Sequence, residues 1–228
     1  MAKRIDLGKF ESAKNGKILK YRIQTVTPEL IDDVVDLMFT HFLPREPLSS
    51  YLGVHKDAKT LDHIDLVWRK LLEDGVALVA LEDVDNGNVK IIGANIVTIS
   101  EKDKEDLEEL EDRNFNKILI VLKEVTNRAN IFEKYNIDRY LSAFGLTVHA
   151  DYHGHQIGYR LLAARRDLCA KLGLTVTGTA FTAQNSQHLA KKAGFETLAE
   201  IVYKNYKIND ELAFPNLEGD VKFMAVKY

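Results

Sequence analysis

The pattern of hydrophobic and polar positions predicts a strand and then two helices near the start of the chain. Residues 18–26, ILKYRIQTV, alternate apolar and polar side chains and include β-branched residues, which is typical of a strand. Thr27 then fits an N-cap and Pro28 the first position of a helix. A second amphipathic run extends from about Thr60 to Leu72. Because residues 44–55 between these runs contain two prolines and a glycine, we expect an ordered loop there.

The rest of the chain alternates strand and helix patterns. Residues 76–100 predict a hairpin with a tight turn at 85–88, Asp-Asn-Gly-Asn. The later patterns predict, in order, a helix ending near Asn127, a strand within 138–150, a helix through Leu172, a strand at 174–180, a helix near 185–193 and strands near 198–206 and 221–227. Helices placed between strands predict the α/β (α+β) class with one mixed sheet. No repeat or linker interrupts this pattern, so we expect a single domain spanning 1–228.

Composition narrows the function classes. The 228 residues are 46% hydrophobic and 29% charged, with a net charge of −3 and a pI near 6.2. The sequence has no excess or cluster of Lys and Arg that would bind nucleic acid or an anionic membrane, so we expect neither partner. The start of the chain lacks the apolar core of a signal peptide, and one cysteine permits no intrachain disulfide. We therefore expect a cytoplasmic protein.

An acidic run, EKDKEDLEELED at 101–112, carries eight acidic side chains. It is expected to begin the helix that ends near Asn127 and to form a solvated helix face. An acidic patch for a cationic partner is the alternative. We assign this run no catalytic role.

The segment with the clearest chemical character is LTVHADYHGHQIGYRLL, residues 146–162. An apolar strand leads into a loop with two glycines, and a helix with an apolar stripe begins around Gln156. Unpaired N–H groups at such a helix start suit phosphate oxygens. The glycines could instead serve only close packing of the turn. The P-loop and G-x-G-x-x-G dinucleotide patterns are both absent here.

The same segment resembles motif A of the GNAT superfamily of acyl-CoA-dependent N-acyltransferases. VHADYHGHQIGYRLL aligns with V-x-P-x-x-R-G-x-G-I-G-x-x-L-L, so His153 takes the usual Arg position and Gln156 replaces the middle glycine. A helix start is not expected to require positive φ at Gln156. A second landmark is NSQHLAKKAGFETL at 185–198, which resembles the family helix that ends in Gly-Phe.

The resemblance implies a fold and a co-substrate. The fold is a mixed, twisted sheet of about seven strands with helices on both faces, splayed between central strands. The co-substrate is acetyl-CoA, with no metal. Its binding residues are expected to be Leu146, Thr147, Val148, His153, Gly154, His155, Gln156, Ile157, Gly158 and Tyr159.

A third landmark points to one branch of the superfamily. FLPREPLSSYLG at 42–53 resembles the loop of insect-type arylalkylamine N-acetyltransferases, whose catalytic Glu falls on Glu46. In that branch a serine takes part in proton handling, and it falls on Ser186, with Thr182 at the position of another hydroxyl. The tyrosine acid of many superfamily members corresponds to Ala190 here, so Ser186 is the favoured substitute. Glu46 could otherwise be an exposed loop residue, and Ser186 a helix cap.

The function implied by this likeness is acetyl-CoA-dependent acetylation of an arylalkylamine of the dopamine, tyramine, octopamine, serotonin or tryptamine type. Attack would be direct, in a ternary complex, with Glu46 as general base. The alternatives are another amine (a polyamine or amino acid), a longer acyl donor, or CoA binding without catalysis. Phe42, Tyr51 and Phe181 are compatible with an aryl pocket, although such aromatics are more often core residues.

Two other chemistries compete with this hypothesis. Cys169 could carry an acyl group, but its place beside the apolar stripe of the motif helix favours core packing. His149, Asp151, His153 and His155 fall within seven residues and could ligate zinc in a hydrolase or a metal-binding module. The glycine and the helix start would break their alignment, so we expect no metal.

Overall fold

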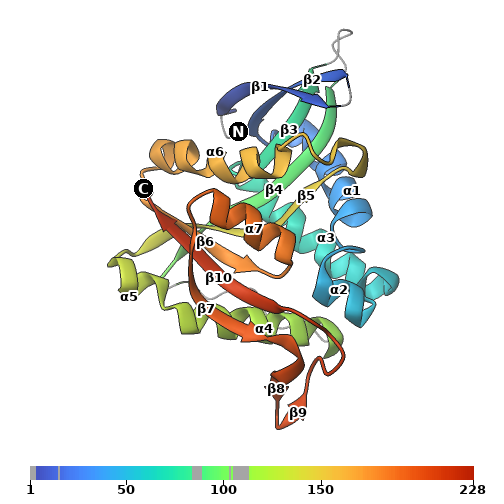
Figure 1. Ribbon diagram of the computed structural model, residues 1–228, viewed down its shortest axis with the longest axis vertical. Helices are drawn as coiled ribbons and strands as arrows, with labels where there is room; N and C mark the ends of the chain where they lie inside the picture. The colour runs from blue at the N-terminus through green and yellow to red at the C-terminus, as the bar shows by residue number, and fades with distance from the viewer. Residues whose placement is uncertain (1–3, 15, 84–88, 103, 105–112) are drawn as a thin grey trace.

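A computed structural model of the protein describes residues 4–14, 16–83, 89–102, 104 and 113–228 (Figure 1). The strands are β1 (Asp6–Lys14), β2 (Lys17–Thr25), β3 (Leu78–Asp83), β4 (Val89–Glu101), β5 (Arg139–Val148), β6 (Val176–Phe181), β7 (Glu196–Val202), β8 (Lys207–Ile208), β9 (Glu211–Leu212) and β10 (Asp220–Lys227). The α-helices are α1 (Ile31–His41), α2 (Pro47–Leu52), α3 (Ala58–Glu73), α4 (Arg113–Ala129), α5 (Ile131–Tyr135), α6 (Ile157–Leu172) and α7 (Gln184–Lys192). The turn expected at 85–88 and most of the acidic run lie outside the described residues.

Eight strands form one mixed sheet in the order β1-β2-β3-β4-β5-β6-β10-β7. Neighbouring strands are antiparallel except for β5 and β6, which are parallel. Two short strands, β8 and β9, pair separately. The predicted class and the mixed sheet are confirmed.

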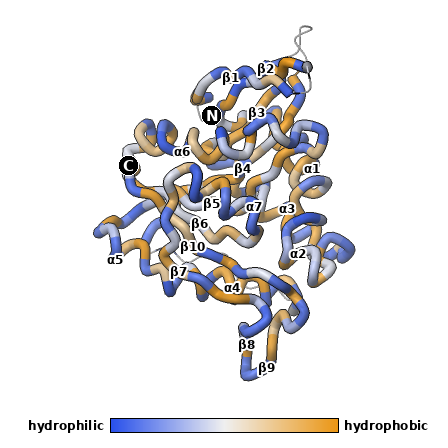
Figure 2. Tube along the Cα trace, viewed as in Figure 1, coloured by the Kyte–Doolittle hydropathy of each residue, from blue (hydrophilic) through white to orange (hydrophobic). Residues whose placement is uncertain are grey.

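Helices cover both faces of the sheet. On one face, α6 packs against apolar residues of β2, β3 and β4 in a cluster that includes Ile23, Ala80 and Leu161. On the other face, α1, α3 and α4 bury residues such as Met38, Trp68 and Val125 in a larger cluster. Figure 2 shows hydrophobic and hydrophilic positions alternating along α4 and α6, as expected of helices with one packed face. No described helix is both long and apolar enough to cross a membrane.

Two features differ from the sequence expectations. The sheet has eight strands rather than about seven, and the pattern gave no indication of β1, whose one buried residue is Leu7. The expected loop at 44–55 contains the short helix α2, because Pro47 occupies the first helical turn, where its missing N–H costs nothing. The chain there turns by a helix instead of an irregular loop.

Candidate active site

The central feature of the site is a wedge between the two parallel strands. β5 and β6 pair in register only at Leu141 and Thr177. Beyond this point two side chains of β6 replace ladder bonds: Thr177 Oγ1 donates to the Leu141 carbonyl at 2.7 Å, and Thr179 Oγ1 donates to the Ala143 carbonyl at 2.8 Å. The strands therefore separate toward their carboxyl ends.

A bulge in β5 adjoins the opening. The β4–β5 register passes from Asn95 opposite Leu146 to Val97 opposite Ala143, so β5 carries one extra residue there. Gly145 within it has φ +140°, and an added Cβ would lie 2.6 Å from the Met38 Cε atom. Only glycine meets both conditions.

A buried arginine braces the closed end of the wedge. Arg165 on α6 is 1% exposed, and its Nε donates to Asn95 Oδ1 at 2.9 Å. Asn95 Nδ2 in turn donates to the Gly145 carbonyl at 2.7 Å. Burial lowers the pKa of Arg165 to about 10, so the group stays charged at neutral pH. The network ties the helix to β4 and to the bulge of β5, and no motif in the sequence indicates it.

The glycine loop joins the end of β5 to α6, as predicted. Leu146, Thr147 and Val148 lie at the carboxyl end of β5, and α6 begins at Ile157 with Gln156 as N-cap. Gly154 has φ +91°, and an added Cβ at Gly158 would lie 3.2 Å from Leu189 Cδ1 on α7. A side chain at either position would therefore be strained or crowded, and the helix start that follows is of the kind that suits phosphate oxygens.

The expectation for Gln156 was wrong. Its backbone adopts φ 61° and ψ 13°, the left-handed conformation. For a residue with a Cβ, that conformation is less stable than the right-handed one by about 1–2 kcal/mol. The glycine of the resembled motif avoids this cost, so Gln156 is a strained replacement for it.

Gln156→Gly is expected to stabilise the protein by about 1 kcal/mol, since relief of strain outweighs the extra backbone entropy of glycine. For a chain of this size the melting temperature should rise by roughly 2–4 °C. Gln156→Ala is the control, because alanine keeps the strain and should give no gain. A fall in the melting temperature of the glycine variant would contradict this reading of the loop.

Glu46 is a buried helix cap rather than an exposed loop residue. It is 8% exposed, its Oε1 accepts from the Leu48 N–H at 3.1 Å and its Oε2 accepts from the Ser49 N–H at 2.7 Å. Glutamate is not among the residues that N-caps prefer. A carboxylate has about four acceptor sites, so both oxygens can still accept a further proton or hydrogen bond.

Tyr203 bonds to the chain that follows β6 and feels the charge of Glu46. It is 1% exposed, and its hydroxyl donates to the Thr182 carbonyl at 2.8 Å, immediately after β6. Burial raises the pKa of Tyr203, and the nearby charge of Glu46 raises it further. Tyr203, which the sequence analysis did not single out, thus contacts the backbone of Thr182, and its pKa responds to the charge of Glu46.

Ser186 lies in the first turn of α7, beyond Thr182. Its hydroxyl donates to the Ala183 carbonyl at 2.7 Å. To protonate a thiolate it would have to give up this bond. Ala190, at the position of the superfamily tyrosine, is fully buried.

The clustered histidines have separate partners. His153 Nε2 lies 3.1 Å from the Val148 carbonyl, His155 Nδ1 lies 3.3 Å from Ser12 Oγ, and His149 Nδ1 lies 3.9 Å from Asp151 Oδ2. Among the residues that the structure describes, no group of three or more His, Cys, Asp or Glu side chains could hold a metal.

The three candidate aromatics lie in different surroundings. Phe181 is buried against Phe195, with ring centroids 5.7 Å apart, and is a core residue. Tyr51 packs edge-on against Phe214 and remains partly exposed. Phe42 approaches Gly145, where its ring would be 3.3 Å from an added Cβ. Phe42 is therefore the one of the three that reaches the bulge.

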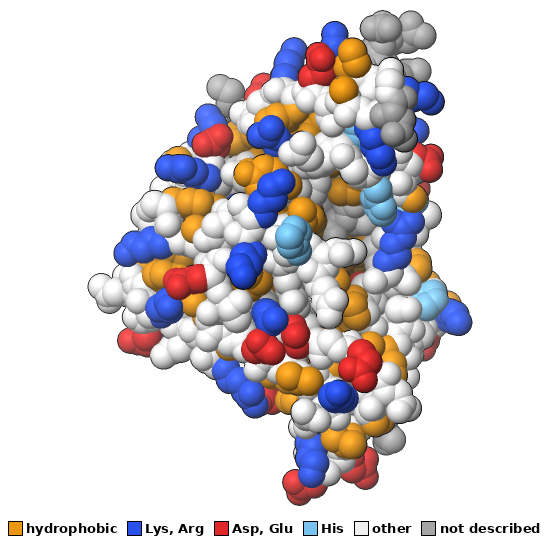
Figure 3. Space-filling model, viewed as in Figure 1, with side chains coloured by type: hydrophobic (Ala, Val, Ile, Leu, Met, Phe, Trp, Pro, Cys, Tyr) orange, Lys and Arg blue, Asp and Glu red, His pale blue; other side chains and the backbone are white. Residues whose placement is uncertain are grey.

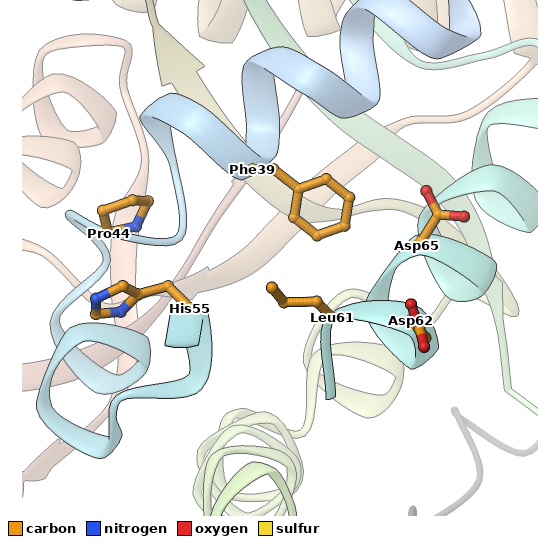
Figure 4. Close-up of a pocket in the computed structure, with 6 residues that line it drawn as sticks. All are labelled: Phe39, Pro44, His55, Leu61, Asp62 and Asp65. Carbon is orange, nitrogen blue, oxygen red and sulfur yellow. The ribbon is translucent and has the colours of Figure 1, made fainter. Parts of the chain in front are cut away.

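A separate pocket of about 270 Å³ lies between α1, the segment before α2, and α3. Figure 4 shows Phe39 and Leu61 pointing toward one another, with the carboxylates of Asp62 and Asp65 beside them. Its lining, within the described part of the chain, includes none of the predicted site residues. Asp65 is already paired with Arg69 at 2.8 Å, and we assign the pocket no chemistry.

Comparisons with known proteins identify the fold. No protein-family model matches the sequence, and no curated protein is significantly similar to it. A solved structure named as an insect putative arylalkylamine N-acetyltransferase 7, from the yellow fever mosquito Aedes aegypti, is 28% identical, with TM-score 0.91 over 98% of this chain and 95% of that one. Arylalkylamine N-acetyltransferase 2 from Aedes aegypti is 24% identical, with TM-score 0.80 over 91% and 98%. A Drosophila melanogaster polyamine N-acetyltransferase is 16% identical, with TM-score 0.74 over 91% and 100%.

The fold, the wedge and these likenesses identify the chain as an acyltransferase of the GNAT fold. Within that class it resembles the insect arylalkylamine N-acetyltransferases, as the Arg45-Glu46-Pro47-Leu48 segment predicted.

Proposed function

We propose that this acyltransferase transfers the acetyl group of acetyl-CoA to the amine of an arylalkylamine such as dopamine, tyramine, octopamine, serotonin or tryptamine. The observation that carries the proposal is the wedge between β5 and β6, where backbone pairing is limited to Leu141 and Thr177. Glu46 supplies a buried carboxylate, and its charge acts on Tyr203, which donates to the carbonyl of the residue after β6. A role in monoamine metabolism in the cytoplasm is part of the same proposal.

Glu46 is proposed to take the proton of the attacking amine. An alkylammonium has a pKa of about 10, so well under about 1% is free amine at neutral pH. A base at the acceptor site removes this barrier, directly or through one water. The capping bonds to Leu48 and Ser49 fix the carboxylate in place while leaving acceptor capacity for that proton.

The residues of the loop and β5 fit acetyl-CoA. Gly154 and Gly158 keep side chains out of the turn into α6, whose first backbone N–H groups suit a diphosphate. When bound, acetyl-CoA supplies the thioester that the amine attacks. A backbone N–H near Leu146 to Val148 is proposed to stabilise the negative oxygen that develops, and Ser186 to return a proton to the departing thiolate.

Cys169 is expected to take no part in the transfer. Its side chain is fully buried, and burial raises the pKa of its thiol to about 12. A raised pKa keeps the thiol protonated at all lower pH values, so the reactive thiolate is nearly absent at pH 8. We predict that a thiol reagent modifies the native protein far more slowly than the unfolded protein at this pH, and that Cys169→Ala retains activity. Rapid labelling of the native protein would contradict the burial argument.

The test of the proposed function is release of free thiol from acetyl-CoA by the purified protein, with tryptamine, dopamine, tyramine, spermidine and amino acids as acceptors. Selective turnover of the aryl amines is expected. Preference for spermidine or an amino acid would overturn the acceptor assignment. CoA binding without turnover of any amine would overturn catalysis.

A further inference from the structure

The β1–β2 hairpin lies against the glycine loop that precedes α6. Strand pairing places Phe10 opposite Tyr21, Ser12 opposite Leu19 and Lys14 opposite Lys17, so these residues share one face of the hairpin. That face contacts the loop and α6 at three successive points. Phe10 lies under the Arg160 guanidinium at 5.0 Å, Ser12 Oγ lies 3.3 Å from His155 Nδ1, and Lys14 reaches His153. Figure 1 shows β1 beside α6.

Lys14 brings its ammonium group to the glycine loop itself. Its Nζ donates to the His153 carbonyl at 2.5 Å, and it would lie 2.7 Å from a Cβ added at Gly154. The ammonium thus occupies the space that the absent side chain of Gly154 leaves. A compact charge with three donors can keep one bond to the loop and offer the others to a ligand.

His153 turns the Nε2 side of its ring toward the end of β5. It stands where the resembled motif has arginine, but its ring nitrogen Nε2 is engaged with the Val148 carbonyl at 3.1 Å. The Nε2 atom of His153 is therefore held by the strand and is not free for a ligand. Lys14, from a strand far away along the chain, stands close to the same backbone.

The charges around the loop favour an anion. Arg160, in the first turns of α6, lies over the rings of Phe10 and Tyr159. Lys192 on α7 lies 4.9 Å from the centre of the Tyr159 ring. Within the described chain no carboxylate forms an ion pair with Lys14, and Glu11 is on the opposite face of the hairpin with Lys20. Figure 3 shows further Lys and Arg side chains over α6 and α7.

We propose that Lys14 binds the diphosphate of CoA at the loop where the resembled motif has an arginine and this chain has His153. The inference rests on the proposed function, since it concerns the same co-substrate. It assigns the amino-terminal hairpin a binding role: β1 forms one wall of the diphosphate site, and Lys14 selects donors that carry the diphosphate over pantetheine thioesters.

The test is calorimetric binding of CoA, dephospho-CoA and pantetheine to the wild-type protein and to Lys14→Met, Lys14→Arg and Lys20→Met. For Lys14→Met we expect about tenfold weaker binding of CoA and of dephospho-CoA, and unchanged binding of pantetheine. Lys14→Arg should restore most of the affinity, and Lys20→Met, the control on the other face, should bind like wild type. The loss should shrink as salt increases, because Lys14 is exposed.

Three results would overturn the inference. The first is unchanged CoA binding in Lys14→Met. The second is an equal loss for pantetheine, which would show that Lys14 only orders the loop. The third is a loss confined to CoA and absent for dephospho-CoA, which would assign the lysine to the 3′-phosphate. A wild-type protein that binds no CoA would overturn the proposed function as well. If the wild-type protein binds CoA and Lys14→Met binds it with the same affinity, this inference alone is overturned.

Discussion

Replacement of Glu46 by glutamine is expected to lower kcat/KM for aryl amines by about 100-fold or more, because the amide cannot accept the proton of the ammonium. The isosteric amide keeps the size of the side chain and one acceptor for the α2 cap. The loss should therefore fall on the rate of transfer and leave CoA binding nearly unchanged. Steady-state kinetics as a function of pH, with a calorimetric measurement of CoA affinity, check this.

The capping role of Glu46 requires a matched control. Asp57 caps α3 in the same way, with its carboxylate accepting from the Lys59 and Thr60 N–H groups. Asp57→Ala should cost about 1 kcal/mol of stability without the loss in rate. If Glu46→Gln kept the wild-type pH–rate profile, or if both variants lost the same activity, Glu46 would be a structural cap and no base.

Gly145→Ala is expected to destabilise the protein by about 4 kcal/mol, the sum of a strained backbone and an overpacked contact. The φ of +140° disfavours any side chain, and the new methyl would lie 2.6 Å from Met38 Cε. A loss of this size is a large part of the stability of an ordinary domain. Activity per folded molecule should fall too, because the bulge shapes the edge of the wedge. Denaturant unfolding and the specific activity of the folded fraction measure these effects.

Gly53→Ala separates the two causes. Gly53 also has a positive φ, +68°, but an added Cβ there meets no atom within 4 Å. It should lose only about 1 kcal/mol. Equal losses at Gly53 and Gly145 would mean that the contact with Met38 contributes nothing and that the bulge tolerates a side chain.

The elements that the sequence predicted correctly are those with strong local signals. The strand, glycine loop and helix from Leu146 to Leu172 follow from apolar periodicity and from the positions of Gly154 and Gly158. Helix α7 was placed within one residue at each end. By contrast, β1 contains Gly8 and several charged residues and buries little, so the apolar pattern did not mark it as a strand.

The rest of the site depends on contacts between distant segments. Tyr203 contacts Thr182 only because β7 ends beside the chain that follows β6. Lys14 reaches the glycine loop only because β1 pairs at the edge of the sheet. Such contacts leave no periodicity or motif in one sequence. The strain at Gln156 was missed for a related reason, since its left-handed backbone is set by the geometry of the turn into α6.

The central claim is direct acetyl transfer to an aryl amine with Glu46 as the base. The most direct measurement follows an isotope-labelled acetyl group from acetyl-CoA, with tryptamine as acceptor, in the wild-type and Glu46→Gln proteins. We predict that the wild-type protein moves the label to the amine nitrogen in step with thiol release, and that the variant does so about 100-fold more slowly. Label appearing as free acetate, or equal rates of transfer in the two proteins, would contradict the account.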